Sequence, residues 1–286
     1  MDHPSKNMDD EFVSNRVSLS GSTSAGEYSG RAAWMRRGIV LVLSCIWLTG
    51  CDGTATTADL KAAEAALSAG DFGAAIAAAD KVLMEGDGGA PAARALYVKG
   101  RAIEDQASTE ADLREAWRNY SEALQAGPTP GLEGYIRTSL AKVAYYLGEY
   151  ATAERQWGIA YDLLKAADLR AWVLYGRGLC QQRQGQWVEA DATFAAVQKE
   201  YPDTEPATRA AAKAGAKAFY VQVGAYEKAA SADAVVGQLR ARGFAAGRSP
   251  SGQLHRVVVG PFTRYVDAAT ARRRIGGEFR DAIIVP

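Results

Sequence analysis

The sequence predicts a protein in two parts, a solenoid of paired α-helices followed by a small module in β-α-β-β-α-β order. Two internal repeats support this prediction. Four segments of the middle of the chain align on an alanine at intervals of 41, 37 and 37 residues. Near the end, a β-branched run closed by glycine and then an aromatic residue occurs at 220–226 and again at 256–262. Repeats of one supersecondary unit indicate a fold assembled from copies of that unit.

The N-terminal region has the order of an export signal. Arg36-Arg37 precede an apolar run from Gly38 to Leu48, which is too short to span a bilayer. Leu48-Thr49-Gly50-Cys51 follows the run, and positive charge, apolar run and small residues occur in the order of a secretory signal. These last four residues resemble the lipobox of bacterial lipoproteins, in which the cysteine becomes the lipidated first residue.

That resemblance implies a set of N-terminal boundaries. Residues 35–50 are expected to be the lipoprotein signal peptide, and 51–57 a linker lipidated at Cys51. Met35 would then be the natural start, with 1–34 a disordered, non-native upstream extension. The protein is expected to face the periplasm in the cell envelope, anchored by lipid to the inner or the outer membrane.

The charge of the chain is unevenly distributed. Residues 217–286 contain 11 Lys and Arg against 5 Asp and Glu, a net charge of +6. The whole chain contains 33 of each kind, so residues 1–216 carry −6. This asymmetry indicates an anionic ligand for the C-terminal part, or else a basic face that is merely solvated.

Few residues are available for catalysis or for metal binding. The chain has two histidines, His3 and His255, and three cysteines without metal-ligand spacing, so zinc sites and histidine bases are not expected. A glycosidase requires a pair of catalytic carboxylates, and no candidate pair stands out among the Asp and Glu residues of the sequence. The sequence therefore predicts a protein that is not an enzyme and has no cofactor or metal. Cys180 lies in an apolar helical pattern and is predicted to be a buried, inert thiol.

Each of the four repeated alanines follows a turn and opens the second helix of a pair. These alanines are Ala75, Ala116, Ala153 and Ala190. Three of the turns are nearly identical: Gly70-Asp71-Phe72, Gly148-Glu149-Tyr150 and Gly185-Gln186-Trp187. Glycine is expected to end one helix in a left-handed conformation, and the aromatic residue to pack between the helices of the pair.

This pattern of small and aromatic positions resembles the tetratricopeptide repeat (TPR). The resemblance implies a TPR-like helical solenoid over 58–204 whose concave groove binds an unidentified protein partner. Arg94, Arg101, Arg137 and Arg177 fall on or near the first helices and could line the groove or be solvated charges. Residues 205–217 are alanine-rich and are predicted to form a helical linker.

The C-terminal module, residues 218–286, is expected to be a four-stranded antiparallel sheet with both helices on one face, the ferredoxin-like plan. Strands are predicted at 219–225, 244–248, 255–259 and 282–285, and helices at 231–242 and 267–276. Alternation directs Phe219, Val221 and Val223 toward the helices and Tyr220, Gln222 and Gly224 away from them. In the third strand it buries His255, Val257 and Val259 and exposes Arg256, Val258 and Gly260.

The two strand motifs, Tyr220–Tyr226 and His255–Phe262, closely resemble the two half-motifs of the SPOR (sporulation-related repeat) domain. That family binds peptidoglycan glycan strands whose stem peptides have been removed, as found at division septa. Ala225 stands where many members have serine. By position, the resemblance assigns peptidoglycan binding to Tyr220, Gln222, Gly224, Arg256 and Val258. The structural motif residues are Val221, Val223, Tyr226, Val257, Val259, Gly260, Pro261 and Phe262.

The sequence features lead to three functional hypotheses. An exposed sheet with Tyr, Gln and Arg suits RNA bases or sugars, and export removes nucleic acid as a natural partner. The leading hypothesis is a non-catalytic envelope lipoprotein that binds denuded glycan and recruits a protein partner in cell division or wall remodelling. The alternative is a TPR adaptor in outer-membrane or envelope assembly with little glycan binding, and the third, an enzyme, lacks a candidate site.

Overall fold

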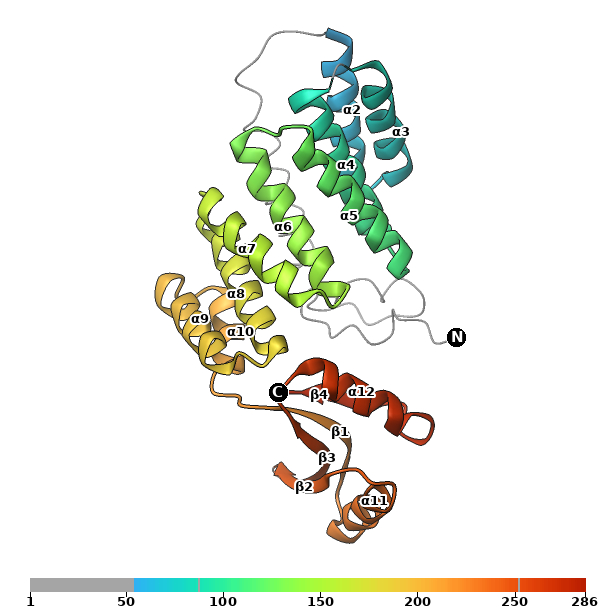
Figure 1. The fold of residues 1–286 in the computed structure, drawn as a ribbon, viewed down its shortest axis with the longest axis vertical. Helices are drawn as coiled ribbons and strands as arrows, with labels where there is room; N and C mark the ends of the chain where they lie inside the picture. Colours follow the sequence, from blue (N-terminus) through green and yellow to red (C-terminus); the bar gives the residue numbers. More distant parts are fainter. Residues whose placement is uncertain (1–53, 87, 252) are drawn as a thin grey trace. The chain divides into compact units, whose positions relative to one another are not determined.

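The computed structural model describes residues 54–86, 88–251 and 253–286. The export signal and Cys51 lie outside the described residues. The chain divides into two compact units between Glu149 and Tyr150, each of which is described by itself (Figure 1). No helix within the described ranges is both long enough and apolar enough to cross a bilayer.

The first unit is built from helices that pack in antiparallel pairs. Ala75 and Ala116 are fully buried where the helices of each pair meet, as the repeat predicted. Gly100 lets the helices approach closely, because a Cβ atom there would lie 2.7 Å from the Tyr120 ring. The described helices of this unit are α2 (Thr54–Ala69), α3 (Phe72–Glu85), α4 (Gly89–Gln106), α5 (Glu110–Gln125) and α6 (Pro130–Tyr146).

The second unit begins with four more helices. Ala153 and Ala190 are buried, and Gly178 repeats the role of Gly100 because its Cβ would lie 2.6 Å from the Phe194 ring. Cys180 is buried, as expected, and burial raises the pKa of its thiol well above the ordinary value. These helices are α7 (Tyr150–Leu163), α8 (Ala167–Gln184), α9 (Trp187–Glu200) and α10 (Glu205–Lys213).

The rest of the second unit is the predicted four-stranded antiparallel sheet with two helices on one face. The strand order is β2-β3-β1-β4, which confirms the predicted fold class. The elements are β1 (Phe219–Tyr226), α11 (Ala229–Ala241), β2 (Ala246–Ser251), β3 (Leu254–Phe262), α12 (Tyr265–Ile275), the short 3₁₀ helix η3 (Gly276–Glu278) and β4 (Ile283–Val285).

Strand β2 differs from the prediction. The sequence favoured a strand at 244–248 broken by Pro250, whereas β2 continues through Pro250 to Ser251 and pairs with β3 along its length. A proline is tolerated here because β2 lies at the edge of the sheet, where one side of the strand needs no hydrogen-bond donor.

The turn aromatics differ from one repeat to the next. Phe72 packs against the core of the first helices, as expected. Tyr150 and Trp187 were expected to pack between the helices of their pairs, and this is wrong. Tyr150 contacts Tyr265 of α12 edge-on, and Trp187 joins the hydrophobic core of the sheet module. Local repeat spacing identifies an aromatic position but cannot identify a partner that is distant in sequence.

Candidate functional site

The uncovered face of the sheet is identified by the strand register. Residues directly opposite each other in an antiparallel pair share one face. Val221 lies opposite Ile284, and both are buried beneath the helices. Gln222 lies opposite Val258 on one side and Ile283 on the other, so these three residues share the opposite face. We call it the open face.

Strand β1 contains a bulge in the middle of this face. Gln222 pairs with Val258, but Gly224 pairs with Val257, so Val223 is an extra residue in β1. A bulge shifts the register by one residue and therefore changes which side chains share a face. Strict alternation no longer describes the strand beyond this point.

The shift moves Gly224 away from its predicted place. Gly224 lies opposite a fully buried valine, on the helix side, and a Cβ there would lie 3.0 Å from the Tyr226 hydroxyl. Ala225 takes the place on the open face instead, exposed and directly opposite Arg256. The assignment of Gly224 to the open row is thereby corrected, and Ala225 is the residue that sequence alternation missed.

Tyr220 lies at one end of the open face, opposite Val285 of β4. Its ring covers Gly260 of β3, because a Cβ placed on that glycine would be 3.0 Å from Tyr220 Cδ1. Gly260 also has φ = 143°, a backbone conformation that disfavours any side chain. Both the backbone and the neighbouring ring therefore require glycine at 260, and the half-buried Tyr220 ring lies against the position that a side chain would occupy.

Arg256 supplies the positive charge of the open face. It is half-buried, yet its Nε is fully enclosed and finds no hydrogen-bond partner among the described residues. A buried donor left unsatisfied costs about 1–3 kcal/mol, and more when the group is charged. An anionic group on the open face cannot reach this enclosed nitrogen, but it could pair with the remainder of the half-buried guanidinium and offset part of the cost of burying its charge. The structure thus brings Tyr220, Gln222, Arg256 and Val258 to one face.

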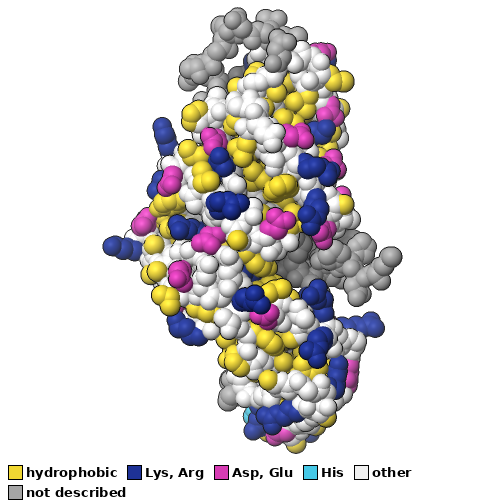
Figure 2. Space-filling model, in the orientation of Figure 1, with side chains coloured by type: hydrophobic (Ala, Val, Ile, Leu, Met, Phe, Trp, Pro, Cys, Tyr) yellow, Lys and Arg dark blue, Asp and Glu magenta, His cyan; other side chains and the backbone are white. Residues whose placement is uncertain are grey.

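The other basic residues of the module lie elsewhere. Arg248 is opposite Val257, on the helix side, and its Nε lies 3.5 Å from a carboxylate oxygen of Asp233 in α11. Arg248 is therefore not part of the open face. Figure 2 shows more basic than acidic side chains over the sheet module, whereas both kinds are interspersed over the helical repeats.

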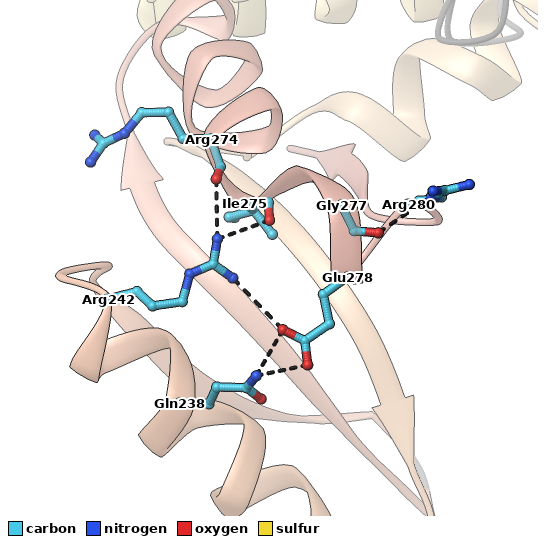
Figure 3. A network of polar contacts seen from close by, with 7 residues as sticks. All are labelled: Gln238, Arg242, Arg274, Ile275, Gly277, Glu278 and Arg280. Atoms are coloured by element: carbon cyan, nitrogen blue, oxygen red, sulfur yellow. Dashed lines mark hydrogen bonds and ion pairs between the residues drawn. The ribbon is translucent and has the colours of Figure 1, made fainter.

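One of these arginines has a structural role at the ends of the two helices. Arg242 Nη2, at the end of α11, donates to the carbonyl oxygens of Arg274 (3.2 Å) and Ile275 (3.1 Å) at the end of α12 (Figure 3). A cation at the last carbonyls of a helix is stabilising. Glu278 accepts hydrogen bonds from Gln238 at 2.7 Å and completes the network. Net charge therefore overstates the attraction of the open face for an anion.

The four arginines that could line the helical groove or be solvated charges all form ion pairs within the chain. Arg94 pairs with Glu64, Arg101 with Asp105 (3.3 Å), Arg137 with Glu133 (2.7 Å) and Arg177 with Glu154 (3.9 Å). Burial is the main cause that raises the pKa of the Glu64 carboxyl, and the Arg94 guanidinium opposes it. Each of these arginines therefore has an acidic partner within the chain, although the exposed pair of Arg177 contributes little to stability.

A buried polar cluster in the first unit was not predicted. The Glu104 carboxylate is 1% exposed and accepts a hydrogen bond of 2.6 Å from the Tyr120 hydroxyl. Lys142 of α6 forms an ion pair with the same carboxylate. Burial and the Glu104 charge raise the pKa of Tyr120 well above its ordinary value. The cluster links α4, α5 and α6, and no spacing in the sequence indicated it.

The fold and the site together define a modular binding protein, made of helical repeats and a sheet module. The open face of the sheet carries the Tyr220 ring, the Gln222 amide and the Arg256 guanidinium, whose Nε has no partner among the described residues. Residues 215–286 match the SPOR domain, and residues 172–204 match the tetratricopeptide repeat, so the chain contains both domains. SPOR domains bind peptidoglycan and TPRs mediate protein interactions, and both are non-catalytic binding modules.

Two solved TPR-type structures are similar to part of the chain. One is YrrB, described as a TPR protein with an unusual peptide-binding site, at 23% identity and TM-score 0.44 over 54% of this chain and 75% of that one. The other is MamA, at 17% identity and TM-score 0.43 over 55% of this chain and 81% of that one. No curated protein matches the chain in sequence.

Proposed function

We propose that this protein is a non-catalytic lipoprotein of the cell envelope that binds denuded peptidoglycan through the open face and recruits a protein partner through its helical repeats. The observation that carries the proposal is the half-buried Arg256 guanidinium, whose Nε has no partner among the described residues, on the same face as Gln222 and Tyr220. Removal of a stem peptide frees a lactyl carboxylate on muramic acid, so denuded glycan offers the anionic group that such a guanidinium lacks.

Each residue of the face has a role in this proposal. Arg256 meets a lactyl carboxylate in a charge-assisted hydrogen bond. Gln222, with one acceptor and two donor hydrogens, bonds sugar amides or hydroxyls. Tyr220 packs against a sugar face, and Val258 and Ile283 flank Gln222 with apolar surface. Ala225, opposite Arg256, lacks the hydroxyl that serine would offer there, so it supplies no side-chain hydrogen bond to the glycan.

Binding is tested by pelleting the purified chain with peptidoglycan sacculi that have been treated with an amidase, and with untreated sacculi. Gln222→Ala combined with Arg256→Ala should abolish the preference for treated sacculi. Arg273→Ala, an exposed arginine in the last turn of α12, is the control for loss of one positive charge and should pellet normally. Normal pelleting of the double variant would reject the assignment of these residues. Failure of the wild-type chain to prefer treated over untreated sacculi would favour the adaptor function.

The envelope location rests on the lipobox that ends at Cys51. Metabolic labelling with a fatty acid should mark the wild-type chain and leave Cys51→Ser unlabelled. A fluorescent fusion of the exported chain should gather at division septa, where denuded glycan is expected, and the Gln222→Ala, Arg256→Ala form should be diffuse. Septal enrichment of that double variant would show that another part of the chain, such as the repeats, directs localisation.

A further inference from the structure

The turn between α8 and α9 lies against the loop between β3 and α12. Trp187 Nε1 donates a hydrogen bond of 3.1 Å to the carbonyl oxygen of Thr263. Gly185 has φ = 83°, and a Cβ added to it would lie 2.9 Å from the same Thr263 oxygen and 3.3 Å from Arg264 Cγ. The two backbones therefore meet with no room for a side chain at position 185.

Aromatic rings continue this contact into the core of the sheet module. The Trp187 ring centre is 4.9 Å from that of Phe219 in β1, and Phe219 is 5.6 Å from Tyr265 in α12. The guanidinium carbon of Arg183, at the end of α8, lies 3.4 Å from the centre of the Tyr265 ring. Aromatic pairs and cation–π contacts at such distances are each favourable, more so when water is excluded.

The contact is buried, as a stable interface requires. Trp187 and Arg183 are each 9% exposed, and Phe219 is 2% exposed. Trp187 belongs to the same hydrophobic cluster as Phe219, Val221 and Ile275, so a helix of the repeat completes the core of the sheet module. Without the turn, Phe219 and Tyr265 would lose part of their cover.

The segment that connects helix α10 to the sheet module is also held by contacts with α9. Five residues separate the end of α10 from the start of β1. Within them, Gly215 N donates to Asp191 Oδ1 of α9 at 2.8 Å, and Lys217 Nζ pairs with the other oxygen of Asp191 at 2.5 Å. These two bonds attach the connecting segment to α9, so it is not a flexible linker.

We propose that the Gly185-Gln186-Trp187 turn is a docking surface for the SPOR domain of this chain, so that α7–α10 and the domain form one cooperative unit. The Gly-X-aromatic turn that closes a repeat at Gly70-Asp71-Phe72 is used here to bind a different domain. If the open face binds glycan as proposed above, docking fixes the direction in which the last repeat presents that face. The wall-binding unit is then 150–286 rather than 215–286.

A pair of glycine variants separates docking from backbone strain. Gly185→Ala and Gly70→Ala introduce the same methyl group at nearly the same left-handed φ, 83° and 77°. Only at Gly185 does that methyl group meet another segment, because nothing lies within 4 Å of the Cβ position at Gly70. The matched measurement is amide hydrogen exchange of the full-length chain, which reports local opening segment by segment.

Gly185→Ala should accelerate exchange in β1 and the first turns of α12 by about tenfold or more, because local opening of the domain becomes easier. Gly70→Ala should leave those segments unchanged. Trp187→Ala should reproduce the effect, with Phe72→Ala, the corresponding turn aromatic, as its control. Equal exchange of β1 and α12 in Gly185→Ala, in Gly70→Ala and in the wild type would overturn the proposal. Exchange needs no glycan, so this result is independent of the sacculus-binding test.

Discussion

Replacing Gly178 in α8 with alanine should destabilise the second unit, although alanine is the better helix former. The added Cβ would lie 2.6, 2.8 and 3.3 Å from three atoms of the Phe194 ring. Ordinary contacts between carbon atoms are about 3.5–4.0 Å, so the ring would have to move by about 1 Å. Phe194 is completely buried and already contacts Tyr175, so it has little space to move into.

The change in the free energy of unfolding for Gly178→Ala is the sum of two opposed effects. Overpacking a core costs about 1–3 kcal/mol, and a rigid ring enclosed on all sides places this site toward the upper end. Alanine regains about 1 kcal/mol relative to glycine in a helix interior. The free energy of unfolding should therefore fall by about 1–2 kcal/mol. Gly158→Ala in α7 is the matched control, because nothing lies within 4 Å of its Cβ position, and it should stabilise by up to about 1 kcal/mol.

Urea unfolding followed by far-ultraviolet circular dichroism measures both variants on the same unit. The two substitutions should have opposite signs, which no argument from helix propensity alone would give. Adding Phe194→Leu to Gly178→Ala should cost less than the sum of the single changes, since a smaller side chain relieves the overlap. If Gly178→Ala stabilised the protein as much as Gly158→Ala, the close approach of α8 and α9 would not exist as described.

Two further predictions concern the first unit. Glu104→Ala should lower the free energy of unfolding by about 3–5 kcal/mol, because Lys142 and the Tyr120 hydroxyl lose their buried partner. Glu110→Ala, which removes an exposed partner of Arg114, should change it by less than about 1 kcal/mol in the same urea titration, and equal losses would contradict the cluster. Asp112 accepts hydrogen bonds of 2.8 Å from the backbone N–H groups of Ser108 and Thr109, which lower the pKa of its carboxyl. The stability that Asp112 contributes should be complete above the ordinary pKa of 3.8 and lost as the pH falls through the lowered pKa. Thermal melts of the wild type and Asp112→Ala should therefore differ at pH 7 and converge in strong acid. A difference that stayed constant with pH would show that the ionised carboxylate is not the cause.

Much of the architecture could be predicted because it depends on local periodicity. The alanines at 75, 116, 153 and 190 lie where helices cross, and the strand motifs fixed the faces of Tyr220, Gln222, Arg256 and Val258. Such positions follow from spacings of two residues in a strand and of three to four in a helix. Their ligand-binding role remains a prediction.

The features that sequence reasoning missed depend on partners distant along the chain. The bulge at Val223 moves Gly224 off the open face, and no residue type in the motif marks it. Trp187 occupies a regular repeat position, but its ring contacts Phe219, which is 32 residues further on. Arg248 lies on the helix side because it pairs with Val257 in the strand register, and its contact with Asp233 depends on where α11 lies against β2. The periodicity of the sequence predicts the face of a helix or strand on which a residue lies. The contacts that the residue makes with other elements can be seen only in the three-dimensional structure.

The proline in β2 also bears on how the domain behaves when many copies gather. An edge strand offers a row of unpaired backbone groups on which another chain can add by strand pairing. Pro250 has no backbone N–H, which interrupts the row of donors along β2, and at the opposite edge β4 is only three residues long. Both edges of the sheet are therefore poor templates for association. If the chain gathers on the wall as proposed above, neither edge of its sheet would favour strand pairing between copies.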